Sequence, residues 1–384
     1  MENKRISNIE KFLDSCKTNN FESYKFSKNS EISSFGLVFA LFNYNFIGKT
    51  SILLENSNLL KITLEKNLKE YKIIRKKFCS DLAYDKPYLQ LLSFTLSSLH
   101  IIKKINETGL EKEINNIFND IGVEEYLNNI KAFKGKPGSG NFAMFYAINL
   151  LHKKIYFNNS CDSSIDLWID LHLLNINKNG FWGSSSSNPY LQFQNGYHQY
   201  EIFNFLKLKN NCWKRAADFI STLSDSNGQF APYPGGGGCF DYDAIYFLTS
   251  QYVASHLYKD TLLKTRKTLI ESINSDGGYC ESKYLRPRSI KNIFLIIKHI
   301  IYTRNDAMFF SFRRNINLLR NRNNRIKTHW TTYQRTWNES NLWDTWFRNL
   351  TILKIEKSLN LISNKDKNTY QFIDYPGIGY EINK

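Results

Sequence analysis

Six stretches of the chain are apolar on nearly every side at the period of an α-helix, and clean alternation of apolar and polar residues is scarce. A helix with no polar face is a buried helix, whereas a half-buried strand alternates with period two. The pattern therefore predicts an all-α protein with six buried inner helices. They begin near Ser33, Asp85, Gly140, Asn195, Cys239 and Glu339. More amphipathic stretches, such as residues 59–78, are expected to form an outer layer.

Three short stretches with a turn-like composition resemble one another. Each has a polar lead of Asn, Asp or Ser, then a glycine, then an aromatic residue one or two positions later, as in NKNGFWG, SDSNGQF and NSDGGY. Their glycines, Gly180, Gly228 and Gly277, are 48 and 49 residues apart. This interval fits a helix, a turn and a second helix, which is the unit of repetitive helical folds.

The turns and the helical pairs between them resemble the terpenoid cyclase and protein prenyltransferase superfamily. Its α/α toroid stacks six helical hairpins into a double ring, and INSDGGY at 273–279 is the closest copy here of its repeated turn. The resemblance implies a single (α/α)6 toroid domain over 1–384, with an irregular N-terminal extension at 1–30 and a helical insertion at 283–327 before the last hairpin. Carbohydrate lyases and uronyl hydrolases use related α/α barrels, so the fold alone does not fix the activity.

Composition adds aromatic side chains and one strongly basic segment. Phe, Trp and Tyr make up 15% of the 384 residues, which suits a cavity lined by rings. The formal net charge is +16, and twelve Lys or Arg residues with a single acid, Asp306, lie between Lys283 and Lys327. Because this segment also holds an apolar run, it fits an anionic membrane surface or an anionic ligand; a solvated arm is the commoner explanation. It contains no recognised nucleic-acid-binding module, so nucleic acid is not an expected partner.

Cysteine spacing and the absence of long apolar runs bear on localisation. The six cysteines lie far apart, and no run approaches 18 uninterrupted apolar residues. The start of the chain does not read as a secretory signal peptide. These features favour a cytoplasmic protein. Docking through the basic segment at 283–327 would make it peripheral to the inner face of the membrane.

If the inner helices surround one cavity, their N-terminal ends bring acids, a histidine, tyrosines and an arginine to one mouth. Such a mixture in an aromatic cavity is the composition of a reaction chamber. The catalytic candidates are Asp241, Asp243, His198 and Tyr200. The substrate-binding candidates are Asn141, Tyr146, Trp182, Glu201, Gly237, Gly238, Asp344 and Arg348.

The stretch GGGGCFDYDA holds the main candidate for acid catalysis. The terpenoid cyclase resemblance places Asp243 on the proton donor of a DxDD motif, with Asp241 at the first position and Ala244 at the fourth. It implies an enzyme acting on an isoprenoid or lipid-linked substrate, with the glycines as a flexible rim of the site. The structural alternative is a helix-terminal aspartate that offsets the helix dipole by roughly 0.3–1 kcal/mol.

A second class of function rests on His198, Tyr200 and Asn141. In lyases and epimerases of acidic glycans, an Asn neutralises the uronate carboxylate while a His or Tyr moves protons. A hydrogen-bonded histidine in an aromatic core is the structural alternative. A third class is a non-catalytic toroid that binds a partner through residues 283–327.

Zinc is the one metal that the prenyltransferase resemblance suggests. Those enzymes hold it with an Asp-x-Cys pair and a later His, and this chain offers Cys239 and Asp241 in the reverse order, with His256 or His198 as a third ligand. Scattered Cys and His without tight spacing are more often structural. We therefore expect no cofactor.

Overall fold

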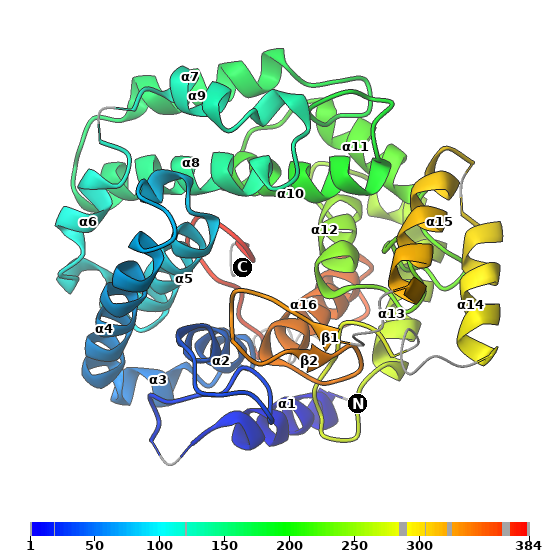
Figure 1. Ribbon diagram of the computed structural model, residues 1–384, viewed down its shortest axis with the longest axis horizontal. Helices are drawn as coiled ribbons and strands as arrows, with labels where there is room; N and C mark the ends of the chain where they lie inside the picture. The colour runs from blue at the N-terminus through cyan, green and yellow to red at the C-terminus, as the bar shows by residue number, and fades with distance from the viewer. Residues whose placement is uncertain are drawn as a thin grey trace. The chain divides into compact units, whose positions relative to one another are not determined.

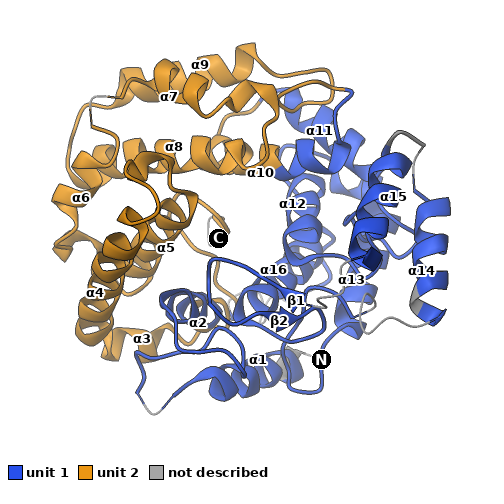
Figure 2. Ribbon diagram, in the orientation of Figure 1, with its two compact units in different colours: residues 1–43, 186–194, 210–369 blue, residues 44–185, 195–209, 370–384 orange. Residues whose placement is uncertain are grey.

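The computed structural model describes residues 2–18, 20–119, 121–283, 290–303, 305–320, 325–362 and 369–381. These residues are mostly helical, and their only sheet is one pair of two-residue strands, which confirms the all-α prediction. The chain forms two compact units (Figure 2). Unit 1 comprises 1–43, 186–194 and 210–369; unit 2 comprises 44–185, 195–209 and 370–384. A single domain over 1–384 stays a prediction.

Ten elements lie wholly within unit 1 (Figure 1). They are α1 (Glu2–Cys16), α11 (Cys212–Ser221), α12 (Gly238–Leu248), the 3₁₀ helix η4 (Ser255–Tyr258), α13 (Lys259–Glu271), α14 (Ile290–Ile301), α15 (Asn305–Arg320), the strands β1 (Arg325–Ile326) and β2 (Arg335–Thr336), and α16 (Leu342–Ser358).

A further ten elements lie wholly within unit 2. They are α3 (Thr50–Glu55), α4 (Ser57–Lys76), η1 (Leu82–Tyr84), α5 (Lys86–Ile101), η2 (Ile105–Glu107), α6 (Glu111–Asn116), α7 (Val123–Asn129), η3 (Ala132–Lys134), α8 (Ser139–Tyr156) and α9 (Asp162–Leu174). Helices α2 (Ser34–Phe46) and α10 (Pro189–Phe205) each contribute residues to both units.

The six predicted inner helices are α2, α5, α8, α10, α12 and α16. Five begin within three residues of the expected start, where local signals are clear; at α5, for example, the Asp85 side chain accepts a hydrogen bond from the Tyr88 N–H at 2.8 Å. Helix α10 begins six residues before Asn195, at Pro189. Proline is favoured in the first turn of a helix, and Asn188 accepts a hydrogen bond from the Tyr190 N–H at 3.1 Å.

The irregular extension expected at 1–30 is wrong over its first half, because residues 2–16 form α1. Ile9, Phe12, Leu13 and Cys16 are fully buried, and their spacing of three and four residues places them on one helical face. Burial of this face stabilises a helix whose polar residues obscure its periodicity in the sequence.

The three predicted turns share one backbone hydrogen-bond pattern. In each, the first Asn or Asp donates its N–H to the carbonyl four residues later, at 2.7 Å for Asn177, 2.8 Å for Asp225 and 2.9 Å for Asn274. In each, the glycine three residues later donates back to it at 3.0 Å. Gly180, Gly228 and Gly277 all have positive φ, of 87°, 76° and 91°, where glycine avoids the Cβ penalty. The predicted repeat is therefore a repeat of conformation.

Within each unit, buried inner helices pack against each other and against more exposed partners. In unit 2, α5 packs against α8, and they contact α4 and α9. In unit 1, α12 packs against α16, and they contact α11 and α13. Helix α4 follows the amphipathic prediction, since it buries Leu60, Leu64 and Leu68, four residues apart.

The described parts of the predicted insertion at 283–327 form the helices α14 and α15 and the short strand β1. Residues 284–289, 304 and 321–324 of this segment lie outside the described residues. Strand β1 pairs with β2 in antiparallel register, with Ile326 opposite Arg335.

Candidate active site

Asp241 and Arg348 form a buried ion pair between α12 and α16 in unit 1. The Arg348 Nη1 atom donates to Asp241 Oδ2, and the Phe230 N–H donates to Asp241 Oδ1 at 2.8 Å. Burial raises the pKa of Asp241 to about 6, although Arg348 and the Phe230 N–H oppose the shift. Burial opposes the charge of Arg348, but Asp241 and Asp344 raise its pKa above its ordinary value. Both oxygens of Asp241 thus have structural partners.

Asp344 lies in the first turn of α16, where Asn341 holds it. Its N–H donates to Asn341 Oδ1 at 2.9 Å, and Asn341 Nδ2 donates to Asp344 Oδ2 at 2.5 Å. The other oxygen, Oδ1, is buried and has no hydrogen-bond partner among the described residues. Burial, assisted by the charge of Glu281, raises the pKa of Asp344 to about 7, while Arg335 and Arg348 oppose the shift. Asp344 therefore keeps its proton to a higher pH than an ordinary aspartate does.

Two charged residues that were not predicted from the sequence complete this cluster. Arg335 Nη2 lies 3.7 Å from Glu281 Oε2 and 4.0 Å from Asp344 Oδ2. Glu281 also accepts a hydrogen bond from the Tyr233 hydroxyl at 2.9 Å. The cluster thus combines the carboxyl groups of Asp241, Glu281 and Asp344 with two guanidinium groups. Asp241 and Asp344 are fully buried, whereas the Glu281 side chain is 20% exposed, and burial beside another carboxyl group favours retention of a proton by Asp344.

The glycine run before α12 lies against these carboxyl groups and is buried, so the rim expected there is closely packed. Gly236 has a φ of 68°, and a Cβ on it would lie 2.2 Å from Asp241 Oδ2. A Cβ on Gly238 would lie 2.1 Å from Asp344 Oδ1, and one on Gly237 would lie 2.6 Å from the Tyr233 hydroxyl. Because glycine has no Cβ, the carboxyl groups of Asp241 and Asp344 can pack directly against the backbone here.

Replacing Gly238 with alanine is expected to displace the Asp344 carboxyl group and to lower the free energy of unfolding by about 1–3 kcal/mol. Gly122→Ala is the matched control, because a Cβ at Gly122 meets no atom within 4 Å. Urea denaturation of both variants tests this, and equal stabilities would contradict the close packing at Gly238.

Aromatic rings line the same part of α16. Trp343 stacks on Phe347 with centroids 3.9 Å apart, and its ring lies 5.1 Å from that of Trp330 and 4.9 Å from that of Phe39. Phe347 is also 4.5 Å from the ring of Tyr242 on α12. The faces of such rings attract cations.

Asp243 is buried, and its charge affects the thiol of Cys239. Desolvation and the charge of Asp243 raise the pKa of Cys239 well above its ordinary value, so its sulfur is a neutral thiol. In the described part of the chain, no three His, Cys, Asp or Glu side chains are grouped so that they could hold a metal ion. The zinc set of Cys239, Asp241 and His256 is therefore wrong, and His256 lies in η4.

In unit 2, the structure brings together Asn141 and His198, as predicted from helix starts. Asn141 Nδ2 lies 2.5 Å from His198 Nε2, and both side chains are buried. Burial, with the nearby charge of Lys86, lowers the pKa of His198 well below its ordinary value. His198 is therefore neutral, as a general base must be.

The other unit 2 candidates have structural partners. The hydroxyl groups of Tyr200 and Tyr146 donate to the carbonyl oxygens of Gly180 and Ile121 at 2.7 and 2.9 Å. Trp182 Nε1 donates to the His172 carbonyl at 2.8 Å, and Glu201 accepts from the Gly379 N–H at 3.0 Å. Their contact with substrate stays a prediction, as does their convergence with the unit 1 residues.

Unit 2 also contains a cavity of about 240 Å³ between α4, α5 and α6. It is lined by Leu68, Lys69, Lys72, Tyr88, Gly109, Leu110, Lys112, Glu113 and Asn116. None of the site residues predicted from the sequence lines this cavity. Its lysines lie on amphipathic helices, whose charged residues are usually just exposed to solvent.

No protein-family model matches this sequence, and neither the curated proteins nor the solved structures compared with it give a match. The function is therefore inferred from the residues themselves.

Proposed function

We propose that this protein is an enzyme that protonates an isoprenoid or lipid-linked substrate, with Asp344 as the proton donor. The observation that carries this proposal is the Asp344 carboxyl group, which has one oxygen held by Asn341 and the other without a partner among the described residues. The sequence favoured Asp243, whereas Asp344 lies beside the guanidinium groups of Arg335 and Arg348. Arg335 and Arg348 are available to stabilise the carboxylate that proton transfer leaves.

In this proposal, Asp344 transfers its proton to a carbon–carbon double bond of the substrate, and a carbocation forms there. The rings of Trp343, Phe347 and Trp330 are suited to stabilise this cation through their faces. Loss of a proton elsewhere on the carbon skeleton restores a neutral product. Buried electrostatic groups that are fixed before the reaction act more strongly than groups in water.

The (α/α)6 toroid belongs to the same proposal. Its support is the repeated turn at Asn177, Asp225 and Asn274, together with inner helices that pack in pairs within each unit. A double ring of hairpins is an arrangement that supplies such helices with a common interior.

A second candidate function is proton abstraction from an acidic glycan in unit 2. The contact of Asn141 with a neutral, buried His198 favours it. Against it, the Tyr200 hydroxyl donates to a backbone carbonyl. We rank this candidate below the acid cluster of unit 1.

A thermal-shift panel separates the candidates, because a ligand that binds the native state alone raises the melting temperature. We expect a polyprenyl diphosphate to raise it, with a stabilisation of about 2.7 kcal/mol at a hundredfold excess over Kd. A shift with acidic oligosaccharides alone would overturn this proposal in favour of the second candidate. No shift with either ligand would contradict both and favour a non-catalytic toroid.

A further inference from the structure

Helices α14 and α15 lie side by side in unit 1 (Figure 1). They present a stripe of exposed apolar side chains. Ile290 and Phe294 are 75% and 67% exposed. The exposed apolar residues are Ile290, Ile293, Phe294, Ile297 and Ile301 on α14, and Phe309 and Phe312 on α15. Their spacing of three, four and seven residues places them on one face of each helix.

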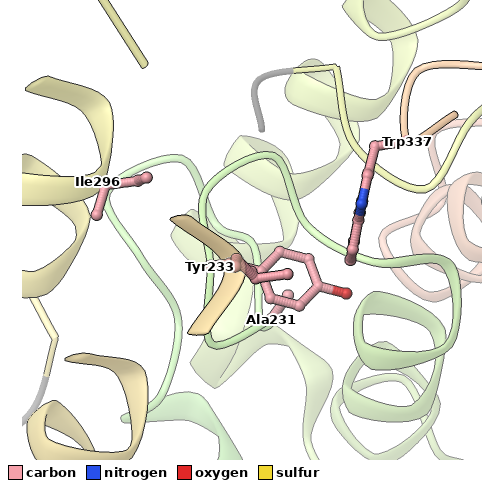
Figure 3. Packing of buried hydrophobic residues seen from close by; sticks show 5 residues of the cluster. Ala231, Tyr233, Ile296 and Trp337 are labelled. Carbon is pink, nitrogen blue, oxygen red and sulfur yellow. The ribbon is translucent and has the colours of Figure 1, made fainter. Parts of the chain in front are cut away.

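The opposite faces of the two helices are anchored to unit 1. Ile296 and Leu318 pack with Ala231, Tyr233 and Trp337 in one buried cluster, and Figure 3 shows Tyr233 between Ile296 and Trp337. Because this face is fixed, the stripe faces solvent.

Polar contacts reinforce that anchor. Ser311 Oγ and Asn315 Nδ2 donate to the Pro232 carbonyl at 3.1 and 2.9 Å. Pro232 and Tyr233 precede the glycine run, so the hairpin is attached beside the candidate active site.

Basic side chains accompany the stripe. Lys291, Lys298, Arg313, Arg314 and Arg320 are exposed. Within 283–327, Asp306 is the single acidic residue. The exposed surface of the hairpin is therefore apolar and cationic at once.

We propose that the α14–α15 hairpin lies on an anionic lipid bilayer, with the stripe at the acyl boundary and the basic side chains at the headgroups. Apolar and basic residues together match such a surface, because apolar side chains enter the acyl boundary and Lys or Arg side chains are attracted to anionic headgroups. A second copy of the chain would place two cationic surfaces against each other. Helix α14 has 12 residues, whereas a span needs about 20, and no helix of the described chain is long and apolar enough to cross a bilayer. This inference does not depend on the proposed catalysis.

The test is co-sedimentation of the full chain with vesicles of phosphatidylcholine, with or without phosphatidylglycerol. The stripe variant is Phe294→Ser with Ile297→Ser, and the matched control is Ile73→Ser with Phe78→Ser, which are 63% and 74% exposed in unit 2. All four positions are exposed, so folding is expected to persist, and circular dichroism checks it.

We expect binding to the phosphatidylglycerol vesicles that weakens with salt, roughly tenfold weaker binding in the stripe variant, and no change in the control. Equal binding of the stripe variant and the wild type would overturn the proposal. It would also be overturned if the wild type bound neither kind of vesicle, or bound vesicles of phosphatidylcholine alone as well as those with phosphatidylglycerol. Light scattering that shows a dimer lost in the stripe variant, without vesicle binding, would assign the stripe to a second copy and also overturn it.

Discussion

Arg348→Met is expected to lower the free energy of unfolding by about 3–5 kcal/mol at neutral pH, because it leaves the Asp241 carboxylate buried without its guanidinium partner. The remaining contact of Asp241, from the Phe230 N–H, does not compensate the charge. Loss of Arg348 raises the pKa of Asp241 further above its value of about 6. The stability difference from wild type is therefore largest at high pH and shrinks as Asp241 is protonated.

Urea denaturation as a function of pH measures this difference, with Arg266→Met as the matched control. Arg266 pairs with Glu356 but is 26% exposed, and Arg5 also contacts Glu356, so the control carboxylate keeps a partner. We expect a loss of about 1 kcal/mol or less in the control. Equal losses in the two variants would show that the Asp241–Arg348 pair is not a buried, mutually dependent pair.

Asp344→Asn is expected to reduce turnover by about 10²–10⁴-fold, which is the usual contribution of a positioned general acid. The substitution keeps the shape of the side chain, so the loss follows from the missing proton rather than from packing. The wild-type rate should fall as pH rises through about 7, because the acid must be protonated to act. The assay uses whichever prenyl ligand shifts the melting temperature.

Asp243→Asn is the paired substitution, and we expect it to retain most of its turnover. If Asp243→Asn lost turnover while Asp344→Asn stayed active, the proton donor would be Asp243, as the sequence suggests, and not Asp344. Loss in neither variant would remove both aspartates from the mechanism.

The same carboxyl group makes stability depend on pH with a defined sign. The pKa of Asp344 is raised from 3.8 to about 7 on folding. Its contribution to the free energy of unfolding is therefore fully present below pH 3.8 and is lost as pH rises through about 7. One proton gives a slope of at most about 1.4 kcal/mol per pH unit. The free energy of unfolding of Asp344→Asn should lack this dependence on pH.

Local patterns allowed the turns and most inner helices to be predicted from the sequence. The first residues of two turns, Asn177 and Asp225, stabilise the turn with their own side chains. Asn177 Oδ1 accepts a hydrogen bond from the Asn179 N–H, and Asp225 Oδ1 accepts one from the Asn227 N–H, in each case two residues later. Such short-range contacts leave a signature in the chain. Helix α1 was missed because its stability comes from burial of one face, which depends on the rest of unit 1.

The acid cluster was predicted only in part, because its contacts are long-range. Asp241 and Arg348 are 107 residues apart in the sequence. Asp241 was a candidate through its motif as well as its inner helix, and Arg348 only through its inner helix. Arg335 lies on a two-residue strand with no motif around it, so nothing in the sequence marks it. Glu281 lies two residues after Tyr279 of the third repeated turn, and the equivalent residues after the other two turns are Ser184 and Pro232, so the repeat does not mark it.

The central claim, that burial raises the pKa of Asp344 to about 7, is tested most directly by infrared difference spectroscopy of wild type against Asp344→Asn. We predict a carboxylic acid carbonyl band in the wild type that is absent from the variant and that titrates away with a midpoint near about 7. A midpoint of about 4, the ordinary value for aspartate, would contradict the account. A band with a midpoint of about 7 that persists in Asp344→Asn would contradict it as well.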